Sequence, residues 1–236
     1  MMKLCTLACA ALPATLLKSV RINSTLNLLA AALLLWCVPV SGQTLDWVNH
    51  PLVPALFGGA ENARSIARDA AGNIYVTGYF ENTADFNPGP GAANLTSSGN
   101  RDVYIAKYNA SGGYEWAKSI GSTNSDFGIG IALDGAGNIW VTGSSLGTVD
   151  FDPGPGVANL TGGQIQDIFL AKYTSSGDYL WAGLIAGNFL KEPASLTVDG
   201  SGNVYMTGYF QGIADFNPGQ GSAFMSSTSS AQEIFI

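Results

Sequence analysis

The sequence GNIYVTG at residues 72–78 returns as GNIWVTG at residues 137–143 and as GNVYMTG at residues 202–208. The three copies start 65 residues apart. A second motif, DFNPG or DFDPG, follows each copy at the same interval and starts at Asp85, Asp150 and Asp215. Two separate motifs that keep one period indicate a repeat architecture.

Each period predicts four short strands joined by turns. In the middle period they are residues 127–134, 139–144, 167–173 and 179–185. The first two flank the turn DGAGN at residues 134–138, where Asp and Asn bond local backbone and Gly permits a positive φ. No stretch after residue 42 has helical periodicity. We therefore expect an all-β protein of four-stranded antiparallel sheets.

Several of these strands lack a clean alternation of apolar and polar residues. Examples are IYVTG at residues 74–78 and VYIA at residues 103–106. A sheet buried on both faces reads this way. Sheets stacked around an axis bury both faces, so the pattern favours a β-propeller.

The N-terminal residues have the order of a secretory signal. Lys18 and Arg21 precede an apolar run at residues 28–40, and Ser41 and Gly42 follow it. A basic region, an apolar core and small residues at the exit are typical of a signal peptide, and thirteen apolar residues are few for a membrane span. We expect cleavage near Gly42, with a retained anchor as the alternative.

Composition narrows the classes of function. Lys3, Lys18 and Arg21 precede residue 43, whereas all 17 acidic residues follow it. The processed chain then carries a net charge of about −10, which disfavours nucleic acid and anionic membranes as partners. Its three cysteines are also early, at residues 5, 9 and 37, so the processed chain has no disulfide, thiolate zinc site or cysteine nucleophile.

The predicted organisation is a signal at residues 1–42 and a repeat region at residues 43–236. Approximate blades cover residues 60–121, 122–187 and 188–236, the last of them incomplete, and residues 45–59 resemble a closing strand. Closed propellers have about four to eight blades. We therefore expect part of a longer propeller, with two open edges.

The motifs resemble the SBBP-type bacterial β-propeller repeat. The features that carry the resemblance are the DxxGNxYVTG hairpin, the DxxxAKY strand and the GxxxW strand; in the first period the first two lie at residues 69–78 and 102–108, and the third ends at Trp116. The resemblance covers residues 45–236. It implies a secreted or surface-exposed propeller and no shared catalytic activity.

The DFNPG and DFDPG loops place side-chain oxygens at alternate positions, as calcium loops do. The pairs are Asp85 with Asn87, Asp150 with Asp152, and Asp215 with Asn217. Each copy offers only two such ligands, so the alternative is a Pro-Gly turn held by the Asp side chain. Calcium is the one cofactor that the sequence suggests.

Catalytic patterns are weak. His50 is the only histidine, and the sequence has no HExxH motif. Acidic residues repeated in every period are typical of a scaffold rather than of a single catalytic pair. We expect a protein that is not an enzyme.

The aromatic residues have two interpretations. Tyr75, Trp140, Tyr205, Trp116 and Trp181 recur inside strands, which favours packing between blades over sugar stacking. The pairs at residues 79–80 and 209–210 follow a strand directly and are better candidates for a binding rim.

These observations predict a secreted or cell-surface propeller that acts as a non-catalytic interaction or structural module for a protein or glycan. The alternatives are a fragment of a secreted propeller hydrolase acting on polysaccharide and a calcium-stabilised adhesin.

Overall fold

The computed structural model of the protein describes residues 61–228 and 231–236. The predicted signal, the closing strand at residues 45–59 and His50 lie outside these residues. The described part has strands and no helix, and all pairings between its named strands are antiparallel. The all-β prediction is confirmed there. No helix in this part is long and apolar enough to cross a bilayer.

Repeat 1 (residues 61–121) forms a four-stranded sheet in the order β1-β2-β5-β6. Its strands are β1 (Glu61–Arg68), β2 (Ile74–Phe80), β5 (Asp102–Tyr108) and β6 (Tyr114–Ile120). A two-stranded ribbon, β3 (Thr83–Asp85) with β4 (Asn94–Thr96), lies between β2 and β5 in the chain. The sequence predicted only a long connection at this place.

Repeat 2 (residues 126–187) and repeat 3 (residues 191–236) follow the same order along the chain. Repeat 2 contains β7 (Phe127–Leu133), β8 (Ile139–Ser145), β9 (Thr148–Asp150), β10 (Asn159–Thr161), β11 (Asp167–Tyr173) and β12 (Tyr179–Gly187). Repeat 3 contains β13 (Lys191–Val198), β14 (Val204–Phe210), β15 (Ile213–Asp215), β16 (Phe224–Ser226) and β17 (Glu233–Phe235).

The ribbon of each later repeat reaches back to the fourth strand of the repeat before it. Asp215 of β15 pairs with Ala186 of β12, which extends the sheet of repeat 2 to six strands. The corresponding bridge between repeats 1 and 2 joins Asp150 to Gly121. The sheet of repeat 3 has three strands, in the order β13-β14-β17.

The turn before each second strand is held by an Asp–Asn pair. In repeat 2, Asp134 Oδ1 accepts from Asn138 N at 2.8 Å and Oδ2 accepts from Asn138 Nδ2 at 2.9 Å. Gly137 adopts a φ of 81°, which a residue with a Cβ rarely takes. Asp69 with Asn73 and Asp199 with Asn203 repeat these bonds. The predicted turn role is confirmed.

The structure also explains the Thr-Gly pair that ends each GNIYVTG-type motif. Thr142 Oγ1 donates to Phe169 O at 2.8 Å across the sheet, and Thr77 and Thr207 donate to the corresponding carbonyls of Tyr104 and Phe235. A β-bulge in β7 sets the carbonyl of Phe127 over Gly143, so that a Cβ there would overlap this oxygen. The bulge therefore requires glycine.

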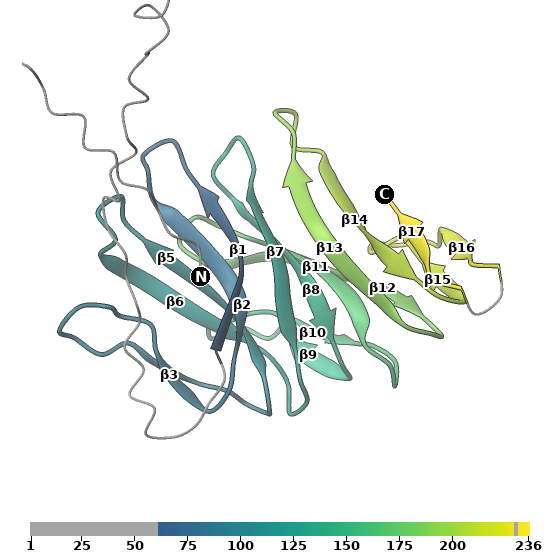
Figure 1. Cartoon of the computed structure of the whole chain (residues 1–236), viewed down its shortest axis with the longest axis horizontal. Coiled ribbons are helices and arrows are strands. Elements are labelled where there is room, and N and C mark those ends of the chain that lie inside the picture. Colours follow the sequence, from purple (N-terminus) through teal and green to yellow (C-terminus); the bar gives the residue numbers. More distant parts are fainter. Residues whose placement is uncertain (1–60, 229–230) are drawn as a thin grey trace, which may run out of the picture. The chain divides into compact units, whose positions relative to one another are not determined.

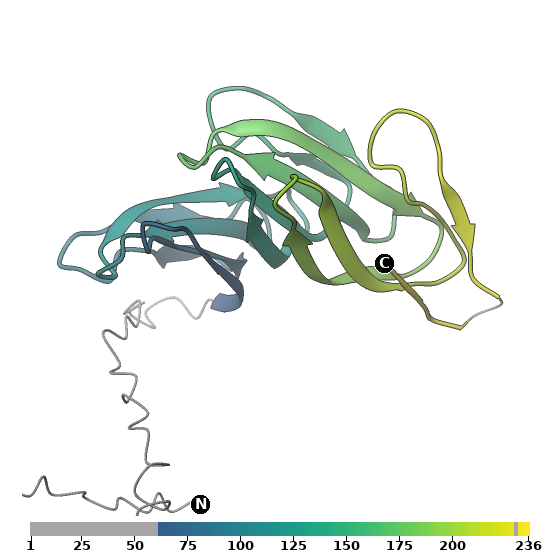
Figure 2. The ribbon, with the colours of Figure 1, turned by 90° about the horizontal axis from the view of Figure 1, so that it is seen from above.

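The repeats lie side by side along the chain, with β7 packed against both β1 and β13 (Figures 1 and 2). Each sheet uses a forward face toward the next repeat and a rear face toward the previous one. At junction 1, Val103 and Ile105 of repeat 1 pack with Ile139 and Phe169 of repeat 2. Junction 2, between repeats 2 and 3, has its own buried cluster, which contains Ile168, Ile185, Phe210, Ala214 and Phe235. The same two faces thus meet twice.

Candidate functional site

The six predicted calcium ligands lie where the ribbons turn, and each Asp of the pairs binds its own loop. Asp150 Oδ1 accepts hydrogen bonds from Asp152 N at 3.0 Å and from Ala158 N at 2.8 Å. Asp85 and Asp215 accept the same two bonds in their repeats.

The second member of each pair also bonds its loop. Asn87, Asp152 and Asn217 each accept from the glycine two residues later, at 2.9, 2.8 and 3.0 Å. These contacts are what a Pro-Gly turn held by side chains requires. Residues 61–228 and 231–236 contain no group of three or more His, Cys, Asp or Glu side chains that could hold a metal ion. Calcium binding by the ribbon residues stays a prediction.

The rear face of repeat 1 is open, whereas the same face of the other repeats is covered. Ile66 is 65% exposed, but its counterparts Ile131 and Leu196 are 4% and 8% exposed. Ile131 belongs to the buried cluster at junction 1. No repeat precedes repeat 1 within the described residues, so no described repeat covers this face.

A cavity of about 580 Å³ occupies this rear face. Its apolar lining includes Ile66, Val76, Phe86 and Tyr108, and Glu61, Arg64 and Asp85 are among its polar residues. Burial raises the pKa of Tyr108 to about 12, so its hydroxyl stays protonated and donates to Phe86 O at 3.0 Å. The cavity is therefore mainly apolar and suits apolar side chains.

The forward face of repeat 3 is open as well. Tyr205, Ile234 and Ile236 are 50%, 79% and 94% exposed. The corresponding residues of repeat 1, Tyr75, Val103 and Ile105, are at most 1% exposed beneath repeat 2. The described chain thus carries one uncovered copy of each of two complementary faces.

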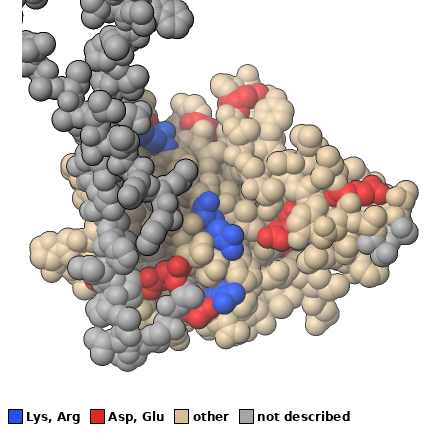
Figure 3. Space-filling model, in the orientation of Figure 1, with Lys and Arg blue, Asp and Glu red and all other residues tan. Residues whose placement is uncertain are grey.

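Charge is sparse on the visible surface. In Figure 3 the Lys, Arg, Asp and Glu side chains form small separate groups between larger stretches that carry neither sign. Only 11% of the whole chain is charged. Much of this face is therefore uncharged.

The predicted aromatic rim is half wrong. Phe80 and Phe210 are at most 1% exposed, because neighbouring residues of a strand point to opposite sides and these two point inward. Tyr79 is partly exposed and packs edge-on against Phe127, with ring centres 5.1 Å apart. Tyr209 donates to Glu192 Oε2 at 2.7 Å.

Most of the aromatic residues inside the strands are packed against other side chains. Tyr75 is 1% exposed, Trp116, Trp140 and Trp181 are partly buried, and the rings of Trp140 and Trp181 lie 6.2 Å apart. Tyr205 is the exception, since its face has no described neighbour. Packing is thus confirmed where a next repeat is present.

Comparison with known proteins agrees with the repeat pattern. Residues 115–149 match the family model described as SBBP, beta-propeller repeat. Within these 35 residues the chain is similar to one SBBP repeat. The matched segment includes the GNIWVTG motif of β8, so the resemblance inferred from the motifs is confirmed.

Two curated proteins are similar to this chain. An uncharacterized WD repeat-containing protein of Acanthamoeba polyphaga mimivirus is 29% identical over 62% of this chain and 12% of its own length. The regulatory protein FlaEY of Caulobacter vibrioides is 26% identical over 65% of this chain and 16% of its own length. The chain therefore spans less than a fifth of either relative.

Sequence reasoning missed the residues that line the junctions. Asp102 and Asp167 begin the strands DVYIAKY and DIFLAKY, and both are at most 1% exposed. Asp126 and Lys191 occupy one position of the 65-residue period and are equally buried. The sequence did contain a signal for these buried positions: a charged residue starts an apolar strand, and its charge changes sign between copies.

Proposed function

We propose that this chain is part of a β-propeller, secreted or held at the cell surface, that serves as a non-catalytic protein-interaction module. Its repeats act as about three blades, each of four strands, with the last incomplete. The SBBP match and a relative named as WD repeat-containing support the propeller. The basic and apolar order of residues 18–42 supports export, which N-terminal sequencing of protein recovered outside the cell would test.

One observation carries the interaction role: Ile66 is 65% exposed at a position where Ile131 is 4% exposed. Exposed contiguous apolar surface of this kind is typical of protein-binding sites. The partner that it suits is a protein presenting an apolar sheet face like that of Val103 and Ile105. We place a protein before a glycan because the cavity lining is mainly apolar.

A second copy of the chain provides the simplest such partner, since its repeat 3 carries the complementary forward face. Contact between the rear face of one copy and the forward face of another is heterologous, so copies add head to tail. Sedimentation velocity over a range of concentrations would detect this association.

Ile66→Glu places a charge in the rear face and is expected to abolish the concentration-dependent species. Val157→Glu is the matched control, because Val157 is 73% exposed and is not among the residues that line the cavity. Its association should equal that of the wild type. A wild type that stays monomeric at all concentrations, or equal effects of the two substitutions, would exclude the rear face as the binding surface.

A further inference from the structure

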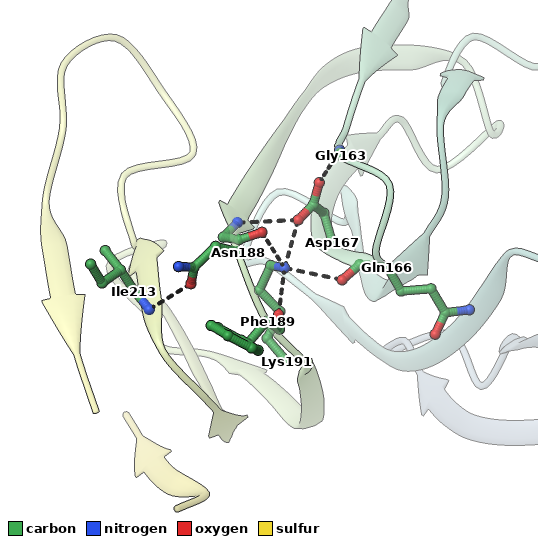
Figure 4. A network of polar contacts seen from close by, with 8 residues as sticks. Gly163, Gln166, Asp167, Asn188, Phe189, Lys191 and Ile213 are labelled. Carbon is green, nitrogen blue, oxygen red and sulfur yellow. Dashed lines mark hydrogen bonds and ion pairs between the residues drawn. The ribbon is translucent and has the colours of Figure 1, made fainter. Parts of the chain in front are cut away.

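Junction 2 contains a buried ion pair. Lys191 Nζ lies 2.7 Å from Asp167 Oδ1, and the two side chains are at most 1% exposed. The ammonium also donates to the carbonyls of Gln166 and Phe189, each at 3.1 Å, and of Gly187 at 3.3 Å (Figure 4). One positive charge thus sits among one carboxylate and three carbonyl oxygens.

Junction 1 has the same framework, but an acidic residue stands where junction 2 has Lys191. Asp102 stands 65 residues before Asp167, and Asp126 stands 65 residues before Lys191. Both acids are 1% exposed. Asp126 N donates to Arg101 O at 2.7 Å, so the start of β7 is joined to the residue beside Asp102. Two carboxylates therefore occupy the positions that hold an ion pair in junction 2.

The hydrogen bonds leave one carboxylate oxygen unpaired. Asp126 accepts from Ser122 N at 2.7 Å, Ser122 Oγ at 2.9 Å and Leu146 N at 3.1 Å. Asp102 Oδ2 accepts from Ser98 N at 2.9 Å and Ser119 Oγ at 3.1 Å. Asp102 Oδ1 is buried and has no hydrogen-bond partner among the described residues.

Comparison with junction 2 explains this oxygen. Its counterpart, Asp167 Oδ1, receives Lys191 Nζ and Gly187 N, the latter at 3.3 Å. In junction 1 the lysine is replaced by Asp126, and the corresponding amide of Ser122 donates to Asp126 instead. Asp102 Oδ1 therefore has neither of the two donors that Asp167 Oδ1 has.

Electrostatics makes this arrangement costly for the bare protein. A buried carboxylate is destabilising unless a positive charge or enough donors face it. Desolvation raises the pKa of Asp126, the bonds from Ser122 and Leu146 oppose the rise, and the charge of Asp102 adds to it. Arg101, the basic residue next to Asp102 in the chain, is paired with Glu81 at 2.6 Å.

We propose that junction 1 binds a calcium ion through Asp102 and Asp126, in the place where junction 2 holds the ammonium of Lys191. The carbonyls of Arg101, Ser122 and Asn124 correspond in sequence to the three that bond Lys191 and supply further oxygen ligands. Calcium accepts six to eight oxygens in irregular geometry, whereas magnesium needs a near-ideal octahedron. A divalent ion also neutralises both carboxylates.

This site is distinct from the ribbon residues predicted from the sequence. The test is thermal unfolding of the full chain, with added calcium and with a chelator, together with calorimetric titration of calcium. With calcium 100-fold above its Kd, the wild-type midpoint should rise by about 5–10 °C relative to the chelated protein.

Asp126→Lys copies the residue that repeat 3 uses at this position. It should raise the midpoint in chelator and remove the response to calcium. Asp102→Asn should also remove the response and serves if the lysine variant does not fold. Asp152→Asn is the matched control, because repeats 1 and 3 carry Asn87 and Asn217 there, and it should respond like the wild type.

Three results would overturn the site. The first is a wild-type midpoint that is the same in calcium and in chelator. The second is a calcium response that survives in Asp126→Lys or is lost in Asp152→Asn, which would move the ion to another place or to the ribbons. The third is a midpoint that rises on mild acidification and ignores calcium, which would mean that the two acids share a proton.

Discussion

Replacing Lys191 with methionine tests the buried pair of junction 2. Methionine keeps most of the length and apolar volume of the lysine stem, so the substitution removes mainly the charge. Asp167 Oδ1 then loses its contact at 2.7 Å, and the carbonyls of Gln166, Gly187 and Phe189 lose a donor.

The expected loss is large because neither partner reaches solvent. Removing one member of a buried ion pair typically destabilises a protein by about 3–5 kcal/mol. In a domain of this size 1 kcal/mol moves the midpoint by about 2–4 °C, so the midpoint should fall by about 6–20 °C. Adding Asp167→Asn should restore part of the loss, since it removes the unpaired charge and keeps an acceptor for Gly163 N.

Differential scanning calorimetry, supported by urea unfolding followed through tryptophan fluorescence, gives the midpoints. Lys107→Met is the matched control, because its partner Glu115 is 37% exposed and pairs of this kind contribute about 0–1 kcal/mol. The reasoning is refuted if Lys191→Met costs no more than Lys107→Met, or if the second substitution deepens the loss.

Two further predictions concern the repeated motifs. Thr142→Val removes the hydroxyl that donates to the buried Phe169 carbonyl and should destabilise the chain by about 1–3 kcal/mol, measured by urea unfolding. Thr148→Val on the exposed ribbon should change the stability little, and equal effects of the two substitutions would contradict this. Burial alone would raise the pKa of Asp134, but bonds from Asn138 and Lys172 outweigh it and lower the pKa to about 2. The stability that ionised Asp134 contributes is therefore present above its ordinary pKa of 3.8 and is lost as the pH falls through about 2. Asp134→Asn should flatten the acid side of the curve of unfolding free energy against pH. An unchanged curve would contradict this.

The period and the strands could be predicted because they depend on local chemistry. The Asp134–Asn138 turn is specified by residues four apart, and the third strand of repeat 2 has the predicted bounds, Asp167–Tyr173. The ribbons were missed because strands of three residues, such as Thr83–Asp85, are too short for a periodic pattern.

The burial of single side chains could not be predicted in this way, because it depends on which other residues pack against the strand. Phe80 follows a strand as a rim residue would, but strand alternation turns it onto Phe86, with ring centres 5.4 Å apart. The exposure of Ile66 and the burial of Ile131 differ although the two repeats match in sequence, because only one of them has a described repeat behind it. Neither fact is encoded within one period.

Thiol labelling tests the stacking of the repeats most directly. Cysteine is placed singly at three equivalent positions, as Ile66→Cys, Ile131→Cys and Leu196→Cys, and peptide-level mass spectrometry follows the reaction with a small alkylating reagent at low protein concentration. Fast labelling of Ile66→Cys with slow labelling of the other two is the predicted result. Similar rates at all three positions would contradict a fold in which each rear face is covered by the repeat before it.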